Sequence, residues 1–154
     1  MKSKQLYNPK TLGEPVGPFS RAVKIGDILY VSGTSAITHQ SGPIWTRPLA
    51  PDFETQARQT FENIRRVLED AGGSLNDIFK ITMLLKDRKY FDQISKLRAE
   101  YLPERAYSST GFITELMRED MLIEIGAEAY LPARRKRRPA KARSARRTRT
   151  RARR

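Results

Sequence analysis

Glu124 is the side chain of this sequence best placed for acid–base chemistry. It falls on the less apolar face of a predicted strand over residues 121–130, whose other face is apolar. Gly126, two residues further on, has no side chain and so leaves space on the face of Glu124. A carboxylate beside such a space is suited to acid–base catalysis. The alternative is a solvated carboxylate on an open sheet face.

Other kinds of catalytic site find little support. The 154 residues include no cysteine, which excludes a thiolate nucleophile, a thiolate metal site and disulfide bonds. The single histidine, His39, lies in a loop-like stretch without a partner motif, and a solvated turn residue is the simpler interpretation. The sequence contains neither a Gly-rich phosphate loop nor a His and carboxylate cluster with metal-ligand spacing.

The net charge of the chain lies at its C-terminus. Residues 134–154 hold 13 Arg and Lys and no Asp or Glu, whereas the whole chain has 30 basic and 17 acidic residues. Subtracting 13 from 30 leaves 17 basic residues against 17 acidic ones in residues 1–133. We therefore predict a neutral folded domain over residues 1–133 and a disordered Arg-rich tail over residues 134–154.

Segments typical of membrane insertion or secretion do not occur. No apolar run approaches the roughly 18 residues that a membrane span needs. The first ten residues, MKSKQLYNPK, include no hydrophobic region of the kind a secretory signal carries. These features favour a cytoplasmic protein without a membrane span.

Apolar periodicity and turn residues predict seven elements in the domain. They are a hairpin over residues 22–31 that turns at Gly26-Asp27, a helix over 52–71, a strand over 77–85, a helix over 91–102, and strands over 107–114 and 121–130. Asp52 is a plausible N-cap of the first helix, and Gly72 suits the left-handed position after its end.

The order β-β-α-β-α-β-β predicts an α+β fold with both helices on one face of a mixed sheet. The strand over residues 77–85 is apolar on both faces, so it should be central and covered on both sides. Since only two helices are available, we expect the open face to be covered by self-association.

Several ordered motifs resemble the Rid/YjgF family of reactive-intermediate deaminases over about residues 15–131. They are Gly17-Pro18-Phe19-Ser20, residues 27–33 (DILYVSG), residues 56–64 (QARQTFENI), residues 68–74 (LEDAGGS), Lys86-Asp87, and residues 123–129 (IEIGAEA). The resemblance implies a chorismate-mutase-like fold that forms a homotrimer, with small-ligand pockets in the clefts between subunits. It also implies cofactor-free hydrolysis of reactive enamines and imines, which arise from amino-acid dehydratases that use pyridoxal phosphate.

The resemblance carries over to individual residues only in part. In the archetype an Arg on the penultimate strand pairs with the substrate carboxylate, and spacing back from Glu124 puts this position at Ser108. Arg105 lies an odd number of residues earlier, so along a strand it would face the other side of the sheet, about 10 Å away. The archetype's Tyr after Gly-Pro is Phe19, and its Asn after the Lys-Asp turn falls near Lys89.

The site that the resemblance implies therefore combines retained and altered positions. Glu124, together with a backbone carbonyl, would hold the water that attacks an imine carbon. The predicted catalytic residues are Glu124 and Thr110, and the predicted substrate-binding residues are Ser32, Phe19, Ser108 and Ser109. Simpler roles are a turn residue for Ser32, core or interface packing for Phe19, and strand-edge polarity for residues 108–110.

Three functions remain open on the sequence alone. The first is a deaminase of reactive enamines and imines with an altered substrate range. The second is a trimeric small-ligand-binding protein that has lost the chemistry together with the Arg, because a guanidinium–carboxylate pair is a strong and specific anchor. The third is non-specific nucleic-acid association through the tail, beginning with its first five residues, Arg134, Arg135, Lys136, Arg137 and Arg138.

Overall fold

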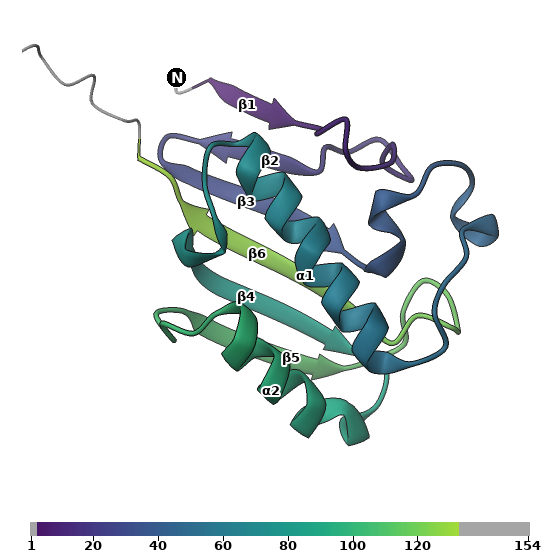
Figure 1. Ribbon diagram of the computed structural model, residues 1–154. Helices are drawn as coiled ribbons and strands as arrows, with labels where there is room; N and C mark the ends of the chain where they lie inside the picture. The colour runs from purple at the N-terminus through teal and green to yellow at the C-terminus, as the bar shows by residue number, and fades with distance from the viewer. Residues whose placement is uncertain (1–2, 133–154) are drawn as a thin grey trace, which may run out of the picture.

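The computed structural model describes residues 3–132 and contains one six-stranded sheet covered on one face by two helices (Figure 1). The strands are β1 Lys4–Tyr7, β2 Ala22–Ile25, β3 Ile28–Thr34, β4 Ile78–Leu85, β5 Ser108–Ile113 and β6 Ile123–Tyr130. The helices are α1 Phe53–Asp70 and α2 Phe91–Tyr101. Short 3₁₀ turns occupy Ala36–His39, Ile44–Thr46, Leu75–Asp77 and Arg88–Tyr90.

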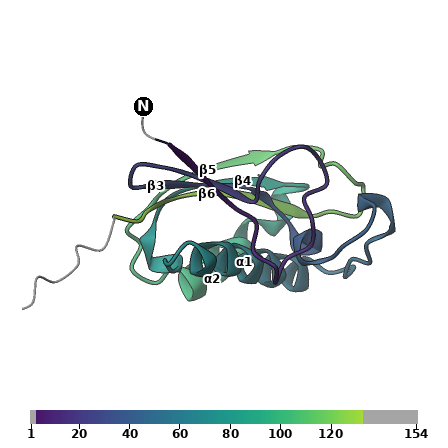
Figure 2. The ribbon, with the colours of Figure 1, turned by 90° about the horizontal axis from the view of Figure 1, so that it is seen from above.

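The strands follow the order β1-β2-β3-β6-β4-β5 across the sheet. The β4–β5 pair is parallel and every other pair is antiparallel, so the sheet is mixed. Figure 2 shows both helices on one side of the sheet. We call the opposite side the open face, because no helix of residues 3–132 covers it. The predicted α+β architecture, with two helices on one face of a mixed sheet, is confirmed.

Helix α1 begins and ends as its sequence predicts. The Asp52 side chain accepts a hydrogen bond from the backbone N–H of Thr55 at 2.8 Å, which satisfies one of the free donors at the helix start. At the other end Gly72 has φ +81°, and the N–H of Gly73 donates to the carbonyl of Leu68 at 2.8 Å. This is a Schellman termination, and it requires the left-handed conformation that glycine adopts without strain.

The core lies between α1, α2 and the covered face of the sheet. The stripe of α1 that faces the sheet includes Ala57, Phe61, Ile64 and Leu68, all fully buried. Alternate residues of β6, from Ile123 to Ala129, are buried on the same side, as period-two alternation requires. Tyr101 of α2 stacks on Phe61 with ring centroids 4.6 Å apart, so aromatic contact joins the two helices.

Three predicted details differ from the structure. Strand β1 was not predicted, because its four residues have no apolar alternation and become a strand only by pairing with β2. Strand β3 continues past Gly33 to Thr34, and an irregularity in its pairing with β6 between Val31 and Thr34 accommodates the extra residue. Phe91, the first residue of the predicted second helix and expected from the apolar periodicity to face the sheet, is exposed at the first position of α2.

Among residues 3–132, no helix combines the length and the apolar character needed to cross a membrane. The tail residues from Arg134 to Arg138, predicted to contact nucleic acid, lie outside the described residues.

Candidate active site

Glu124 lies on the open face of the sheet, in the middle of β6. Its neighbours Ile123 and Ile125 are buried toward the helices, so the alternation of the strand sends the Glu124 side chain to the opposite side. On one flank it pairs with Leu84 of β4, and on the other it lies against the irregular part of β3. The carboxylate is therefore held over the sheet between two neighbouring strands.

Gly33 makes room for this carboxylate. A Cβ atom built on Gly33 would lie 2.2 Å from Oε1 of Glu124 and 3.1 Å from Cδ, far closer than real atoms approach. Only a residue without a side chain can occupy this position while Glu124 keeps its conformation. The irregularity that carries β3 past Gly33 thus brings bare backbone against the Glu124 carboxylate.

The carboxylate of Glu124 is poorly solvated and has no partner among residues 3–132. It is half-buried, and no residue in the described range 3–132 donates a hydrogen bond or forms an ion pair with it. Burial raises the pKa of Glu124 above its usual 4.5. A carboxylate with a raised pKa and unused acceptor positions is suited to hold a water molecule and to take a proton from it.

Ser32 ties the segment that carries Phe19 to the neighbourhood of Glu124. Its hydroxyl donates to the carbonyl of Ser20 at 2.7 Å, and its backbone N–H donates to the carbonyl of Arg21 at 3.0 Å. Phe19 follows a tight turn in which its N–H donates to the carbonyl of Gly17, and its side chain is 43% exposed. Ser32 and Phe19 thus belong to the side of the site formed by β3.

A buried guanidinium holds the same segment in place. Arg21 donates to the carbonyls of Gly13 at 2.7 Å, Glu14 at 2.8 Å and Thr38 at 3.3 Å. Burial, with a smaller contribution from the nearby Arg47, lowers the pKa of Arg21 to about 10. The segment between β1 and β2 is therefore fixed by carbonyl contacts to a charged side chain.

The predicted residues of β5 separate onto two faces. Ser108 and Thr110 pair with Lys80 and Thr82 of β4 and share the open face with Glu124. Since β4 lies between them and β6, Thr110 is about 12 Å from Glu124 by sheet geometry. Within one chain the structure therefore does not bring Thr110 or Ser108 into contact with Glu124.

Ser109 points to the helix side of the sheet, because it pairs with the buried Ile81. Its Oγ accepts a hydrogen bond from Nη1 of Arg98 in α2 at 3.0 Å. Arg105, rejected on the sequence as a substitute for the archetype's Arg, lies before β5 with φ +54°. The structure thus places Ser109 beside Arg98 and away from Glu124.

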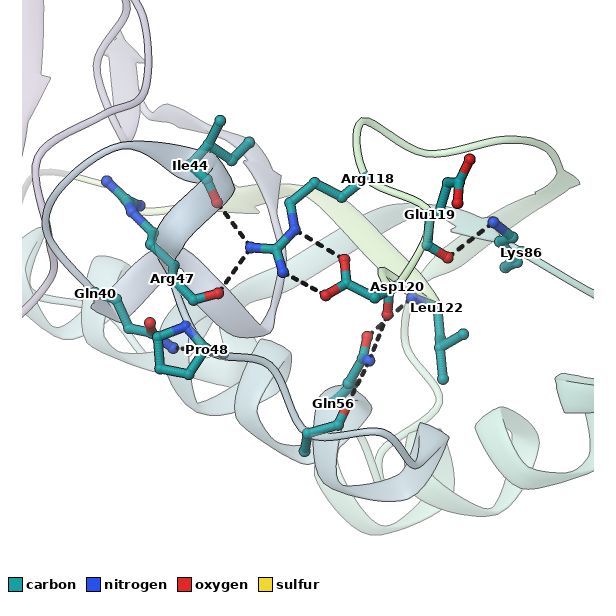
Figure 3. Close-up of polar contacts among 11 residues, drawn as sticks. Gln40, Ile44, Arg47, Pro48, Gln56, Lys86, Arg118, Glu119, Asp120 and Leu122 are labelled. Carbon is teal, nitrogen blue, oxygen red and sulfur yellow. Dashed lines mark hydrogen bonds and ion pairs between the residues drawn. The ribbon is translucent and has the colours of Figure 1, made fainter.

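A polar frame fixes the loop that leads into β6 (Figure 3). Gln56 of α1 donates to the carbonyls of Ala50 at 2.7 Å and Asp120 at 2.9 Å, and its side-chain oxygen accepts from the N–H of Leu122 at 2.9 Å. Arg118 donates to the carbonyls of Ile44 at 2.7 Å and Arg47 at 2.8 Å.

Two further contacts complete this frame. The Arg118 guanidinium pairs with Asp120, and its hydrogen bonds hold the pKa of that carboxyl below its usual value. Lys86 donates from Nζ to the carbonyl of Glu119 at 2.9 Å. The start of β6, and with it Glu124, is positioned by contacts to α1, to residues 44–47 and to Lys86 after β4.

Sequence reasoning did not find Gln56 or Arg98. Gln56 lies on the predicted helix, but only the fold shows that residues 120–122 return to its side chain. Arg98 and Ser95 are three residues apart on α2, a spacing at which helix side chains meet. The spacing of Arg98 and Ser95 could be recognised in the sequence, whereas the contact of Arg98 with β5 could not be predicted from it.

The fold and the site define a two-layer α+β protein with a half-buried carboxylate on an open sheet face. A family model described as endoribonuclease L-PSP matches residues 10–131. A RutC family protein of Pyrococcus horikoshii is 36% identical over 127 residues, which cover 82% of this chain and 98% of that protein.

Two further relatives agree with this match. A protein of Acinetobacter baylyi named 3-aminoacrylate deaminase RutC is 30% identical over 128 residues, covering 83% of this chain and 98% of that one. The crystal structure of RidA from an Antarctic Psychrobacter is 30% identical with a TM-score of 0.73, covering 82% of this chain and 99% of that one. The predicted membership is confirmed: the chain belongs to the Rid/YjgF family, whose model carries the name endoribonuclease L-PSP.

Proposed function

We propose that the protein is a hydrolytic deaminase of reactive enamine and imine intermediates, with a substrate range altered from that of its relatives. The main support for the proposal is the half-buried carboxylate of Glu124, which is held against the backbone of Gly33 and has no partner in the part of the chain that the structure describes. A relative that is 30% identical is named a 3-aminoacrylate deaminase, and 3-aminoacrylate is an enamine. Family membership and the geometry of Glu124 support the same chemistry.

The reaction needs one activated water and no other reagent. An enamine first tautomerises to its imine, and a water held by Glu124 and a backbone carbonyl attacks the imine carbon. As the new C–O bond forms, Glu124 takes one proton from the water and passes it to the nitrogen. The proton of the new hydroxyl then passes to the nitrogen, again through Glu124, as the C–N bond breaks and the C=O bond forms, and the products are a carbonyl compound and ammonia.

We further propose that the working form is a homotrimer with its sites between neighbouring copies. Five exposed apolar side chains of the sheet lie on the open face, where no described helix covers them; they are Leu6, Ile25, Tyr30, Phe112 and Tyr130. An apolar patch of this kind favours self-association. In such an assembly Ser108 and Thr110 of one copy would serve the Glu124 of another. The predicted mass in light scattering is that of three chains.

The decisive experiment is an assay of imine hydrolysis by the full chain. A pyridoxal-phosphate threonine dehydratase generates the imine, and release of the 2-oxo acid is followed with and without the protein. We expect acceleration over buffer and a loss of at least about 100-fold in Glu124→Gln, because a general base contributes roughly that much. Glu128→Gln is the matched control, since Glu128 lies on the same face of β6 and pairs with Lys80 at 2.7 Å. If imines from several amino acids all hydrolyse at the buffer rate, the proposal is wrong.

A binding protein without catalysis is the second candidate. The position expected to hold the anchoring Arg is Ser108, whose hydroxyl donates to the carbonyl of Phe79 at 3.4 Å. On the open face nearby, Lys80 is already paired with Glu128. If this candidate holds, small carboxylates raise the melting temperature of the protein while no imine is turned over.

A further inference from the structure

Three arginines surround two adjoining hollows on the helix side of the sheet. The larger hollow, about 540 Å³, lies between α2 and β5, and Arg88 and Arg98 are among its lining residues. The smaller, about 330 Å³, is bordered by Arg98 and Arg105. No acidic residue lines either hollow, and none of the three arginines forms an ion pair within residues 3–132. In a domain that is neutral overall, this concentration of positive charge is suited to an anion.

Arg98 is shared by both hollows and is held in a fixed orientation. Its Nη1 donates to the Oγ of Ser109 at 3.0 Å, and its Nη2 donates to the Oγ of Ser95 at 3.3 Å. Ser95 in turn donates to the carbonyl of Phe91 at 2.8 Å. Both partners of the guanidinium are thus neutral hydroxyls, one from α2 and one from β5, and no acidic residue of the described range pairs with its charge.

The Nε–H of Arg98 is buried and has no acceptor among residues 3–132. An unsatisfied buried donor is unfavourable, more so when it carries charge. A carboxylate satisfies such a guanidinium best, because its two oxygens match the fork of N–H donors and its charge is opposite. Nε itself is covered by the protein, so a carboxylate in the hollow would bind through the N–H group that Nη1 and Nη2 each keep free of the two serine contacts.

The walls of the larger hollow are mostly apolar. They include Met83, Leu85, Phe91 and Ile113 beside the two arginines. An apolar wall next to a guanidinium fits a ligand that joins one carboxylate to a short aliphatic group. It fits a fully hydrated inorganic anion poorly, because such an ion loses water without gaining contacts.

We propose that Arg98 anchors small aliphatic carboxylates in the groove between α2 and β5, with Ser95 and Ser109 orienting its guanidinium. Identifying this carboxylate as that of the substrate rests on the proposed function. Glu124 faces the other side of the same sheet, so a single chain cannot bring both groups to one ligand. Since β5 is the outermost strand, a neighbouring copy that approaches this edge of the sheet closes the groove.

Direct binding tests the site without any catalysis. Butyrate, its neutral analogue butyramide and inorganic phosphate are titrated into the full chain and into three variants, and binding is followed by NMR chemical shifts. We expect butyrate to bind, butyramide not to bind, and Arg98→Gln to weaken butyrate at least about tenfold. Arg98→Lys should keep part of the affinity, because it keeps the charge but loses the fork. Lys96→Gln, one charge removed from the same helix, is the matched control and should bind as the natural protein does.

Three results would contradict the proposal that Arg98 binds small carboxylates. They are equal binding of butyrate by Arg98→Gln and the natural protein, equal binding of butyramide and butyrate, and tighter binding of phosphate than of butyrate. Melting temperatures of the variants separate a loss of binding from a loss of folding.

The outcome also separates this site from the proposed function. If butyrate binds through Arg98 but the protein hydrolyses no imine, the carboxylate site is supported and the deaminase proposal is wrong. If the protein hydrolyses imines and Arg98→Gln has an unchanged KM, the deaminase proposal is supported and Arg98 is not the anchor of its substrate. If both proposals hold, Arg98→Gln raises KM for the imino acid more than it lowers kcat.

Discussion

At the scale of single residues, the environment of Glu124 determines when it can act. Desolvation favours the protonated form, so the pKa of Glu124 in the folded protein lies above 4.5. Below that raised pKa the carboxyl holds its proton and cannot accept one from water. We therefore expect kcat/KM for imine hydrolysis to rise with pH through an acid limb above pH 4.5, and this limb to be absent in Glu124→Gln.

The raised pKa of Glu124 also predicts an effect on stability. Stability should fall as pH rises, whereas kcat/KM should increase. A carboxyl whose folded pKa is raised binds its proton more tightly when folded, so its stabilising contribution is present below the unfolded pKa and is lost as pH rises through the folded pKa. At pH 7 the ionised Glu124 is therefore unfavourable, and Glu124→Gln should melt at a higher temperature than the natural protein. A lower melting temperature at pH 7, together with equal values at pH 4, would show that a partner stabilises the carboxylate.

The position of a residue in the fold can be predicted from the sequence when the pattern that determines it is local. The alternation along residues 121–130 was enough to put Glu124 and Gly126 on one face, because side chains of a strand alternate strictly. The three consecutive residues 108–110 cannot all share a face for the same reason, and only the register with β4 shows that Ser109 faces the helices. The contact of Glu124 with Gly33 depends on pairing between strands about 90 residues apart in sequence, which no local pattern encodes.

At the scale of elements, the frame around Gln56 links α1 to the loop before β6. Gln56 is 1% exposed and makes three hydrogen bonds to backbone groups. Gln56→Ala leaves two carbonyls and the N–H of Leu122 without this partner, so we expect a loss of about 3 kcal/mol in the free energy of unfolding. Urea denaturation measures it. Gln93→Ala, on the exposed face of α2, is the control and should change stability by less than about 0.5 kcal/mol. Equal stability of the two variants would mean that water replaces Gln56 in the frame.

The elements themselves were largely predictable, and the exceptions have a common cause. The amphipathic stripe and both ends of α1 are local features, so its bounds differ from the predicted ones by a single residue at each end. Strand β1 and the last residues of β3 exist because a neighbouring strand offers hydrogen bonds. Such pairing overrides weak local preference, which is why strand ends are less predictable than helix ends.

At the scale of the whole molecule, two parts of the chain favour association with other molecules for different physical reasons. The open face of the domain presents apolar side chains, including Tyr30 and Tyr130, on the same side of the sheet as Glu124. The tail contributes charge only, with 13 basic residues and no aromatic residue among residues 134–154. Assembly should therefore depend on the domain and persist at high salt, whereas any association through the tail should weaken as salt is added.

We propose that the tail binds nucleic acid without reading its sequence, because it offers positive charge but no aromatic side chains for base stacking. The full chain should bind duplexes of unrelated sequence with equal affinity in a fluorescence titration, and affinity should fall steeply, on the order of 10³-fold, between about 50 and 200 mM salt. A chain ending at residue 133 should lose this binding while it keeps its oligomeric mass and its imine hydrolysis. Those two retained properties show that the truncated domain is intact. Binding that survives the truncation, or that differs between duplex sequences, would place the nucleic-acid contact on the domain instead of the tail.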